Sequence, residues 1–164
     1  MRFDLTQRID APVDEVAAAY AGRDLYEHLG ATTKLGPPEV LDRTERDGSV
    51  ELRIRYRFIG DLAPAVTAVV DPERLTWVEV SRHDLPARTV SVELQPDHYA
   101  DRLRCSGTYR YREIDDGTTE RVVEGDLRVR ALLVAGAVER AMVSGLAEHL
   151  AEEASAVAAF LGAT

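Results

Sequence analysis

One stretch of the sequence has the features of a long helix, and it lies at the end of the chain. Residues 136–161 contain no proline and are rich in Ala, Leu and Glu, which favour helix formation. Much of the remaining sequence alternates apolar with polar residues, which is the period of a strand with one buried face. One long helix after a series of such strands favours an α+β fold, in which the helix covers one face of a curved antiparallel sheet.

The alternation predicts strands at residues 1–9, 39–45, 49–58, 75–81, 89–95, 102–113 and 118–130. The clearest hairpin signal is Asp47-Gly48, a dipeptide that suits a tight turn between two strands. After the first strand, proline and glycine positions delimit two short helices, at 13–21 and 24–29, and Asp24 is expected to cap the second. For residues 64–70 we favour a further short helix over a strand.

Charge excludes several kinds of partner. The 164 residues include 20 Lys and Arg against 29 Asp and Glu, a net charge of −9, which disfavours nucleic acid and anionic membranes. The longest uncharged apolar run, residues 131–138, is far shorter than the roughly 18 residues of a membrane span. We therefore expect a cytoplasmic chain of one domain, residues 1–164, without stable membrane insertion. The sequence does not fix its oligomeric state.

The motifs of several common chemistries are missing from the sequence. Cys105 is the only cysteine, which excludes an internal disulfide. No serine lies in a G-x-S-x-G motif, and the glycines form no nucleotide-binding motif. The histidines lack the spacing of metal ligands, so we expect neither a metal nor another cofactor; they are His28, His83, His98 and His149.

The order of elements resembles the helix-grip fold of the START-like (SRPBCC) superfamily, which includes polyketide cyclases, plant pathogenesis-related allergens and lipid-transfer domains. The strings IDAPVDEVAAAY and VAGAVERAMVSGLAEHLAEEASAVAAFL are similar to that superfamily's usual entry into its first helix and its usual final helix. With ATTKLGPPEVLDR, YRFIGDL and PDHYADRLRCSGTY, nearly the whole chain resembles one START-like family of unknown function. The resemblance implies the fold and a hydrophobic ligand, while the superfamily hosts binding, transport and catalysis alike.

In such a fold the inward side chains of the sheet either fill the core or line a ligand cavity. Alternation places Tyr56, Tyr109 and Tyr111 on inward faces. For residues 75–81 it leaves open which face is inward, but Trp77 and Glu79 share a face. On the outward faces, arginines of strand 102–113 are expected to pair with acidic residues of strand 118–130, which accounts for them without nucleic acid.

The final helix carries a polar pair within its apolar stripe. At about 100° per residue, Met142 and Leu146 fall on one continuous apolar face. His149 and Glu153 lie within that face and are four residues apart, so they can pair with each other. A carboxylate and an imidazole on a buried face need partners, so this pair indicates a structural network, a ligand contact or an acid-base couple.

These residues favour the binding, with transport as an option, of a small hydrophobic or amphipathic molecule between the sheet and the final helix. The expected contacts are Tyr56, Trp77, Tyr109, Tyr111, Met142, Leu146, His149 and Glu153. Two alternatives stay open. One is a cyclase or dehydratase type of enzyme that uses His149 as general acid-base and Glu153 to orient it. The other is a protein-interaction module whose cavity is filled by its own side chains.

Overall fold

A computed structural model describes residues 1–68, 70–131 and 134–162. The elements follow the predicted order of one strand, two short helices, further strands and a long final helix. They are β1 (Arg2–Ile9), α1 (Val13–Tyr20), α2 (Arg23–His28), β2 (Glu39–Arg46), β3 (Ser49–Arg57), α3 (Pro64–Thr67), a 3₁₀ turn (Pro72–Arg74), β4 (Thr76–Asp84), β5 (Thr89–Pro96), β6 (Leu103–Asp115), β7 (Thr118–Val129) and α4 (Ala135–Gly162). The predicted helix-grip α+β fold is confirmed.

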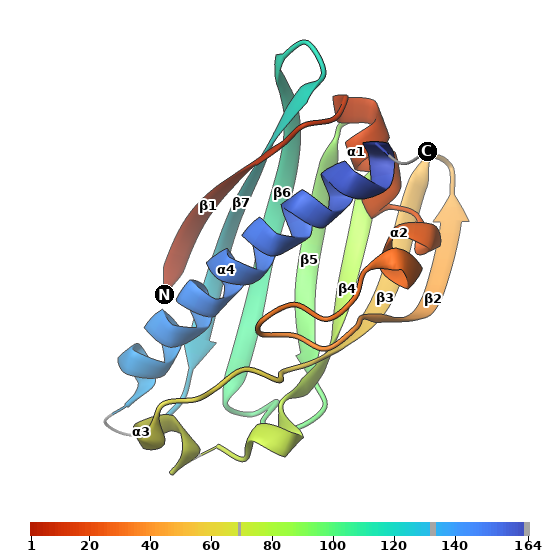
Figure 1. Cartoon of the computed structure of the whole chain (residues 1–164). Helices are drawn as coiled ribbons and strands as arrows, with labels where there is room; N and C mark the ends of the chain where they lie inside the picture. Colours follow the sequence, from red (N-terminus) through yellow and green to blue (C-terminus); the bar gives the residue numbers. More distant parts are fainter. Residues whose placement is uncertain (69, 132–133, 163–164) are drawn as a thin grey trace.

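The strands form one antiparallel sheet in the order β1-β7-β6-β5-β4-β3-β2. Consecutive strands pair with each other from β2 to β7, and β1 pairs with β7, so β1 and β2 are the two edge strands of the sheet. α4 crosses one face of this curved sheet diagonally, and α1 and α2 lie at one end of it (Figure 1). The long connection from α2 to β2 runs across the same face (Figure 1).

Two local predictions can be compared directly with the structure. Asp47 and Gly48 have φ angles of 50° and 80° and join β2 to β3, which confirms the predicted turn. The prediction that Asp24 caps the second helix was wrong. α2 begins one residue earlier, and its N-cap is Gly22, which has no side chain that could accept a capping hydrogen bond. Asp24 lies instead in the first turn, where its charge favours the helix N-terminus. The short helix predicted for 64–70 is present as the single turn α3; Val69 lies outside the described residues.

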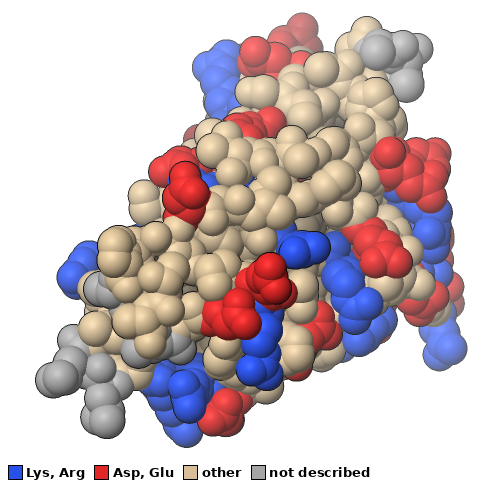
Figure 2. All heavy atoms as spheres, turned by 60° about the horizontal axis from the view of Figure 1, so that its bottom comes forward, with Lys and Arg blue, Asp and Glu red and all other residues tan. Residues whose placement is uncertain are grey.

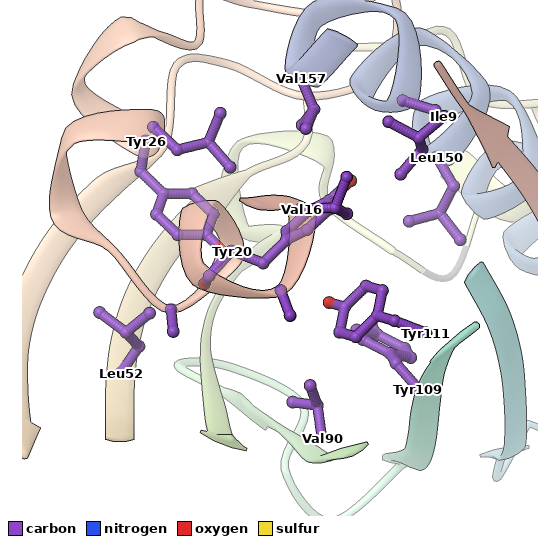
Figure 3. Close-up of a cluster of buried hydrophobic side chains, with 14 of the residues drawn as sticks. Ile9, Val16, Tyr20, Tyr26, Leu52, Val90, Tyr109, Tyr111, Leu150 and Val157 are labelled. Carbon is purple, nitrogen blue, oxygen red and sulfur yellow. The ribbon is translucent and has the colours of Figure 1, made fainter. Parts of the chain in front are cut away.

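The inner face of the sheet and the three larger helices share one core. Side chains from α1, α2 and α4 converge on those of β3, β5 and β6 (Figure 3). On β3 the alternate residues Val50, Leu52, Ile54 and Tyr56 are buried, as the sequence pattern predicted. Several aromatic side chains take part, and two of them, Tyr20 and Tyr111, stack with ring centres 5.7 Å apart.

The outer face of the sheet is charged. Arg110 pairs with Glu124 at 2.7 Å, and Arg112 pairs with Glu120. These cross-strand pairs join β6 and β7 as predicted. Basic and acidic side chains also lie next to each other in Figure 2, which looks at the lower end of the molecule in Figure 1 and not onto the outer face of the sheet. Among the described helices, none is long and apolar enough to cross a membrane.

Candidate functional site

A cavity of about 70 Å³ lies inside the molecule, between the inner face of the sheet and α4. Of the residues predicted to contact a ligand, all but Met142 line it: Tyr56, Trp77, Tyr109, Tyr111, Leu146, His149 and Glu153. Met142 is half-buried one turn before Leu146 and does not belong to the lining. The fold therefore gathers side chains from β3, β4, β6 and α4 around one space.

One wall of the cavity is aromatic. Tyr56 on β3 is the cross-strand partner of Trp77 on β4, and their rings stack with centres 6.0 Å apart. The imidazole of His149 approaches the Tyr56 ring edge-on, at 6.1 Å between ring centres. These rings offer apolar surface together with a hydroxyl and ring N–H groups, which suits a ligand with both apolar and polar parts.

The opposite side holds a buried ion pair that the sequence interpretation missed. Arg121 on β7 donates from Nη1 to Glu153 Oε2 at 2.6 Å and to the Tyr20 hydroxyl at 2.8 Å. The guanidinium carbon lies 4.2 Å from the ring centre of Tyr20 and 4.4 Å from that of Tyr109, so the cation has aromatic rings around it. Because Arg121 and Glu153 are both almost fully buried, their charges balance each other inside the protein.

Glu153 is held as a carboxylate by these contacts. Burial alone raises its pKa, but the charge of Arg121, the charge that His149 carries when it is protonated, and the hydrogen bonds from Arg121 and Tyr20 outweigh burial and lower the pKa overall. The Tyr20 hydroxyl donates to Oε2 at 3.1 Å. Glu153 is therefore ionised at neutral pH and its Oε2 is occupied by partners within the protein.

The predicted pair of His149 and Glu153 is present, but it is the longest of the three contacts of this carboxylate, after those with Arg121 and Tyr20. Nε2 of His149 lies 3.9 Å from Glu153 Oε1, beyond hydrogen-bond distance. Nδ1 lies 3.2 Å from the Thr32 hydroxyl, in the connection between α2 and β2. Burial, followed by the Arg121 charge, lowers the pKa of His149 despite the opposing effect of Glu153, so the imidazole is neutral at pH 7.

Strand β4 contributes a line of polar side chains to the cavity. Trp77, Glu79, Ser81 and His83 all line it, which settles the orientation that the sequence left open. The Ser81 hydroxyl lies 3.0 Å from His83 Nε2. Burial lowers the pKa of His83 to about 4, with Arg121 and Arg43 adding to the effect. His83 is therefore neutral near pH 7.

Glu79 differs from the other buried charged groups. Burial and, to a smaller extent, the negative charge of Glu153 raise its pKa to about 7, against an opposing effect of Arg121. Its carboxyl group keeps some accessible surface because it borders the cavity. Near neutral pH it exists in both its protonated and its ionised form.

Cys105 also lines the cavity, and burial raises the pKa of its thiol to about 12. The thiol is therefore protonated at neutral pH, and it contributes a small apolar side chain. Among the described residues, no group of three or more His, Cys, Asp or Glu side chains is arranged to hold a metal ion.

Comparison with known protein families agrees with this geometry. Residues 4–161 match the family described as "Protein of unknown function (DUF2505)". The chain belongs to this family. The match covers β2 to β7, most of β1 and nearly all of α4, so it includes every residue that lines the cavity except Phe3. Among curated proteins, none matches the sequence.

Solved structures share the fold at low sequence identity. The protein TTHA0849 from Thermus thermophilus is 14% identical with a TM-score of 0.66, over 100% of this chain and 99% of that one. A norcoclaurine synthase point mutant from Thalictrum flavum, in complex with a transition-state analogue, is 15% identical with a TM-score of 0.67, over 99% and 96%. The Zhui aromatase/cyclase from Streptomyces sp. R1128 is 21% identical with a TM-score of 0.51, over 80% and 69%. These matches confirm the START-like fold.

Proposed function

We propose that this DUF2505 protein binds a small hydrophobic or amphipathic molecule in the cavity between the sheet and α4. The observation that carries the proposal is an interior space with aromatic walls that also exposes polar groups from three elements: Glu79 on β4, Arg121 on β7 and His149 on α4. A core that served only stability gains little from polar groups around a void, because each polar group loses its hydration on burial. The same groups can recognise the polar part of a ligand.

The volume of the cavity limits what it can hold without rearrangement. At about 70 Å³ it has room for a few water molecules, whereas sites for drug-sized ligands span roughly 300–1,000 Å³. A larger ligand must displace side chains at the border. Phe3, Leu94 and Leu146 are apolar, half-buried side chains that line the cavity, so we expect them to move when a larger ligand binds. The ligand is therefore small, or its binding opens the cavity.

The proposed contacts keep the roles expected from the sequence. Tyr56, Trp77 and Tyr109 give the apolar walls, together with Tyr111 and Leu146. His149 and Glu153 are the polar anchor, now joined by Arg121 through its 2.6 Å ion pair with Glu153. Because the charges of Arg121 and Glu153 neutralise each other within the protein, the polar anchor acts mainly through the edge of the His149 ring that carries Nε2. The shape of the site also contributes.

The alternative cyclase or dehydratase function receives less support from the geometry. Aromatase/cyclase and norcoclaurine synthase are named among the structural matches, and His149 borders the cavity as a neutral imidazole. An orienting carboxylate, however, should accept a hydrogen bond from its histidine at about 2.6–3.2 Å, and Glu153 lies 3.9 Å away with its other oxygen held by Arg121. The alternative of an interaction module with a filled core is weakened by the polar lining of the remaining space.

Two measurements together test the binding proposal. Native mass spectrometry of the purified protein should show a reproducible extra mass that disappears on denaturation. Trp77 is the only tryptophan and borders the cavity, so its fluorescence should respond when small apolar compounds are titrated in. A protein that carries no extra mass and whose Trp77 emission is unchanged by any compound of the panel would overturn the proposal.

A further inference from the structure

Glu79 occupies an apolar position in the sheet. Its neighbours across the ladder are Ile54 on β3 and Leu94 on β5, neither of which has a polar side chain. Along its own strand, the residues on the same face are Trp77 and Ser81. The Ser81 hydroxyl lies at hydrogen-bond distance from His83. The sheet therefore surrounds this carboxyl group with side chains that do not neutralise it.

The rest of the interior does not neutralise Glu79 either. Within the described part of the chain, its carboxyl group forms neither a hydrogen bond nor an ion pair. The buried cation whose charge acts on Glu79 is Arg121. Arg121 is already paired with Glu153 at 2.6 Å and donates a hydrogen bond to the Tyr20 hydroxyl. A buried carboxylate without a partner is unfavourable, and this one borders the cavity instead of the packed core. A ligand group that pairs with Glu79 would therefore have to lie in that cavity.

We propose that Glu79 is the recognition site for a cationic group of the ligand, specifically the ammonium of a small amine with an apolar body. This inference rests on the proposed binding function and names the chemical class of the ligand. An ammonium in the cavity would form a charge-assisted hydrogen bond with the Glu79 carboxylate and restore the balance of charge.

The surroundings of Glu79 suit a cation more than other polar groups. The stacked rings of Tyr56 and Trp77 border the same cavity, and aromatic faces attract an ammonium group. An anionic ligand would instead meet two carboxylates, Glu79 and Glu153, while Nη1 of Arg121 is already engaged by Glu153 and Tyr20 and only its Nε has no hydrogen-bond partner. A neutral alcohol fits the apolar walls but gains no charge pairing.

Binding of an amine should release the proton that Glu79 holds in the free protein. The pKa of about 7 means that the carboxyl group is largely protonated at pH 5.5 and largely ionised at pH 8. Alkyl amines titrate near pH ~10, as lysine does, and stay protonated over this range. Affinity for an amine should therefore rise from pH 5.5 to pH 8.

The titratable groups that interact with Glu79 come from five elements. They are Glu153 from α4, Arg121 from β7, Tyr26 from α2, Tyr56 from β3, and Cys105, Tyr109 and Tyr111 from β6.

The test compares amines with alcohols of the same shape. The probes are n-butylamine with butan-1-ol and benzylamine with benzyl alcohol, titrated into the full chain while Trp77 fluorescence and amide chemical shifts are followed. At pH 8 the wild-type protein should prefer each amine by at least about tenfold, since a hydrogen bond between charged groups is roughly twice as strong as one between neutral groups. At pH 5.5 the preference should largely disappear.

The variant Glu79→Gln keeps the shape of the side chain and removes its charge. It should bind the alcohols as the wild type does, lose the preference for amines and lose the pH dependence. Glu93→Gln is the matched control, because Glu93 lies exposed on the neighbouring strand β5 and its substitution should leave the preference intact. Unchanged alcohol binding shows that the Glu79→Gln cavity is folded.

The outcomes separate this inference from the function on which it rests. Equal affinity for amines and alcohols in the wild type, or a preference that survives Glu79→Gln, would overturn the role of Glu79 and leave the binding cavity standing. If no probe binds and native spectra show no extra mass, the binding function itself is rejected. If no probe binds but an extra mass is present, the cavity stands and a small amine as its ligand is overturned.

Discussion

Arg121 on β7 and Glu153 on α4 form an ion pair of 2.6 Å inside the protein, with both side chains almost fully buried. The pair connects the final helix to the sheet next to the candidate ligand cavity. Tyr20 on α1 takes part through its hydroxyl, which accepts from Arg121 and donates to Glu153. Three elements that are distant in the sequence therefore meet at one polar cluster. The position of α4 over the sheet depends on this cluster as well as on apolar packing.

Breaking the ion pair from one side should be strongly destabilising. Glu153→Gln leaves the Arg121 charge buried without its carboxylate, and Arg121→Met leaves the Glu153 charge in the same state. Each should lower the free energy of unfolding by about 3–5 kcal/mol, as measured in urea. The double variant Arg121→Met/Glu153→Leu removes both charges and should recover most of that loss. Single variants that differ from the wild type by less than about 1 kcal/mol would show that the pair contributes little.

Glu79 should make the protein less stable as the pH rises. Its folded pKa of about 7 is above the ordinary value of 4.5, so the folded state binds the proton more tightly than the unfolded state. The stabilisation by protonation is complete below pH 4.5 and is lost as the pH rises through 7, a change of about 3 kcal/mol. Glu79→Gln should remove this pH-dependent contribution to the free energy of unfolding. When unfolding is measured at pH 5.5 and at pH 8, the stability of the variant relative to the wild type should therefore be higher at pH 8.

Two buried histidines, His83 and His149, also make the stability depend on pH, and their contributions must be separated from that of Glu79. The lowered pKa of His83, about 4, gives the opposite sign, because the unfolded imidazole binds its proton first and stability falls as the pH drops below 6.5. The lowered pKa of His149 acts in the same direction. These contributions are the same in wild type and Glu79→Gln and cancel in their difference. If the difference between the two proteins were equal at both pH values, the raised pKa of Glu79 would be refuted.

The overall fold was predictable because the patterns that define it are local. Alternation along each strand and the proline-free final helix depend only on neighbouring residues. The two-residue turn at Asp47-Gly48 needed no more than the dipeptide itself. Helical periodicity likewise placed His149 and Glu153 on one face of α4, and the structure has them there.

The site was harder to predict, since it depends on how distant elements meet. Alternation in β7 offered a signal for Arg121: with Glu120 and Glu124 assigned to the outer face, Arg121 must face inward. In β4 both faces contain buried residues, because Val78 and Val80 are buried on the outer side next to Arg55 and Arg53. Periodicity could not decide between the two faces, so Glu79 could not be placed.

The connection between α2 and β2 should lose one of its contacts with α4 when Thr32 is replaced. The Thr32 hydroxyl lies 3.2 Å from His149 Nδ1 and accepts a hydrogen bond from the Leu35 amide at 3.1 Å. Thr32→Val removes both contacts with little change in shape and should cost about 1–2 kcal/mol of unfolding free energy. Hydrogen exchange at the Leu35 amide should become faster. Thr33→Val is the control, because Thr33 contributes its backbone amide, which donates to Glu152. Equal exchange rates in the two variants would contradict the role given to the Thr32 hydroxyl.

Two positions one turn apart on α4 provide the most direct test of where a ligand binds. Leu146 lines the cavity, and Met142 is half-buried outside it. A helical projection places both on the apolar stripe, but it gives the direction of a side chain and not its position along the sheet. Leu146→Phe should reduce the space available and weaken binding of every probe at least about tenfold, because a crowded cavity must distort to admit a ligand. Met142→Phe should change binding by less than about twofold. Phenylalanine keeps Trp77 as the sole tryptophan, so fluorescence titration reads both variants in the same way, and thermal unfolding checks that each is folded. Weakened binding in Met142→Phe but not in Leu146→Phe would place the ligand nearer the N-terminal end of α4.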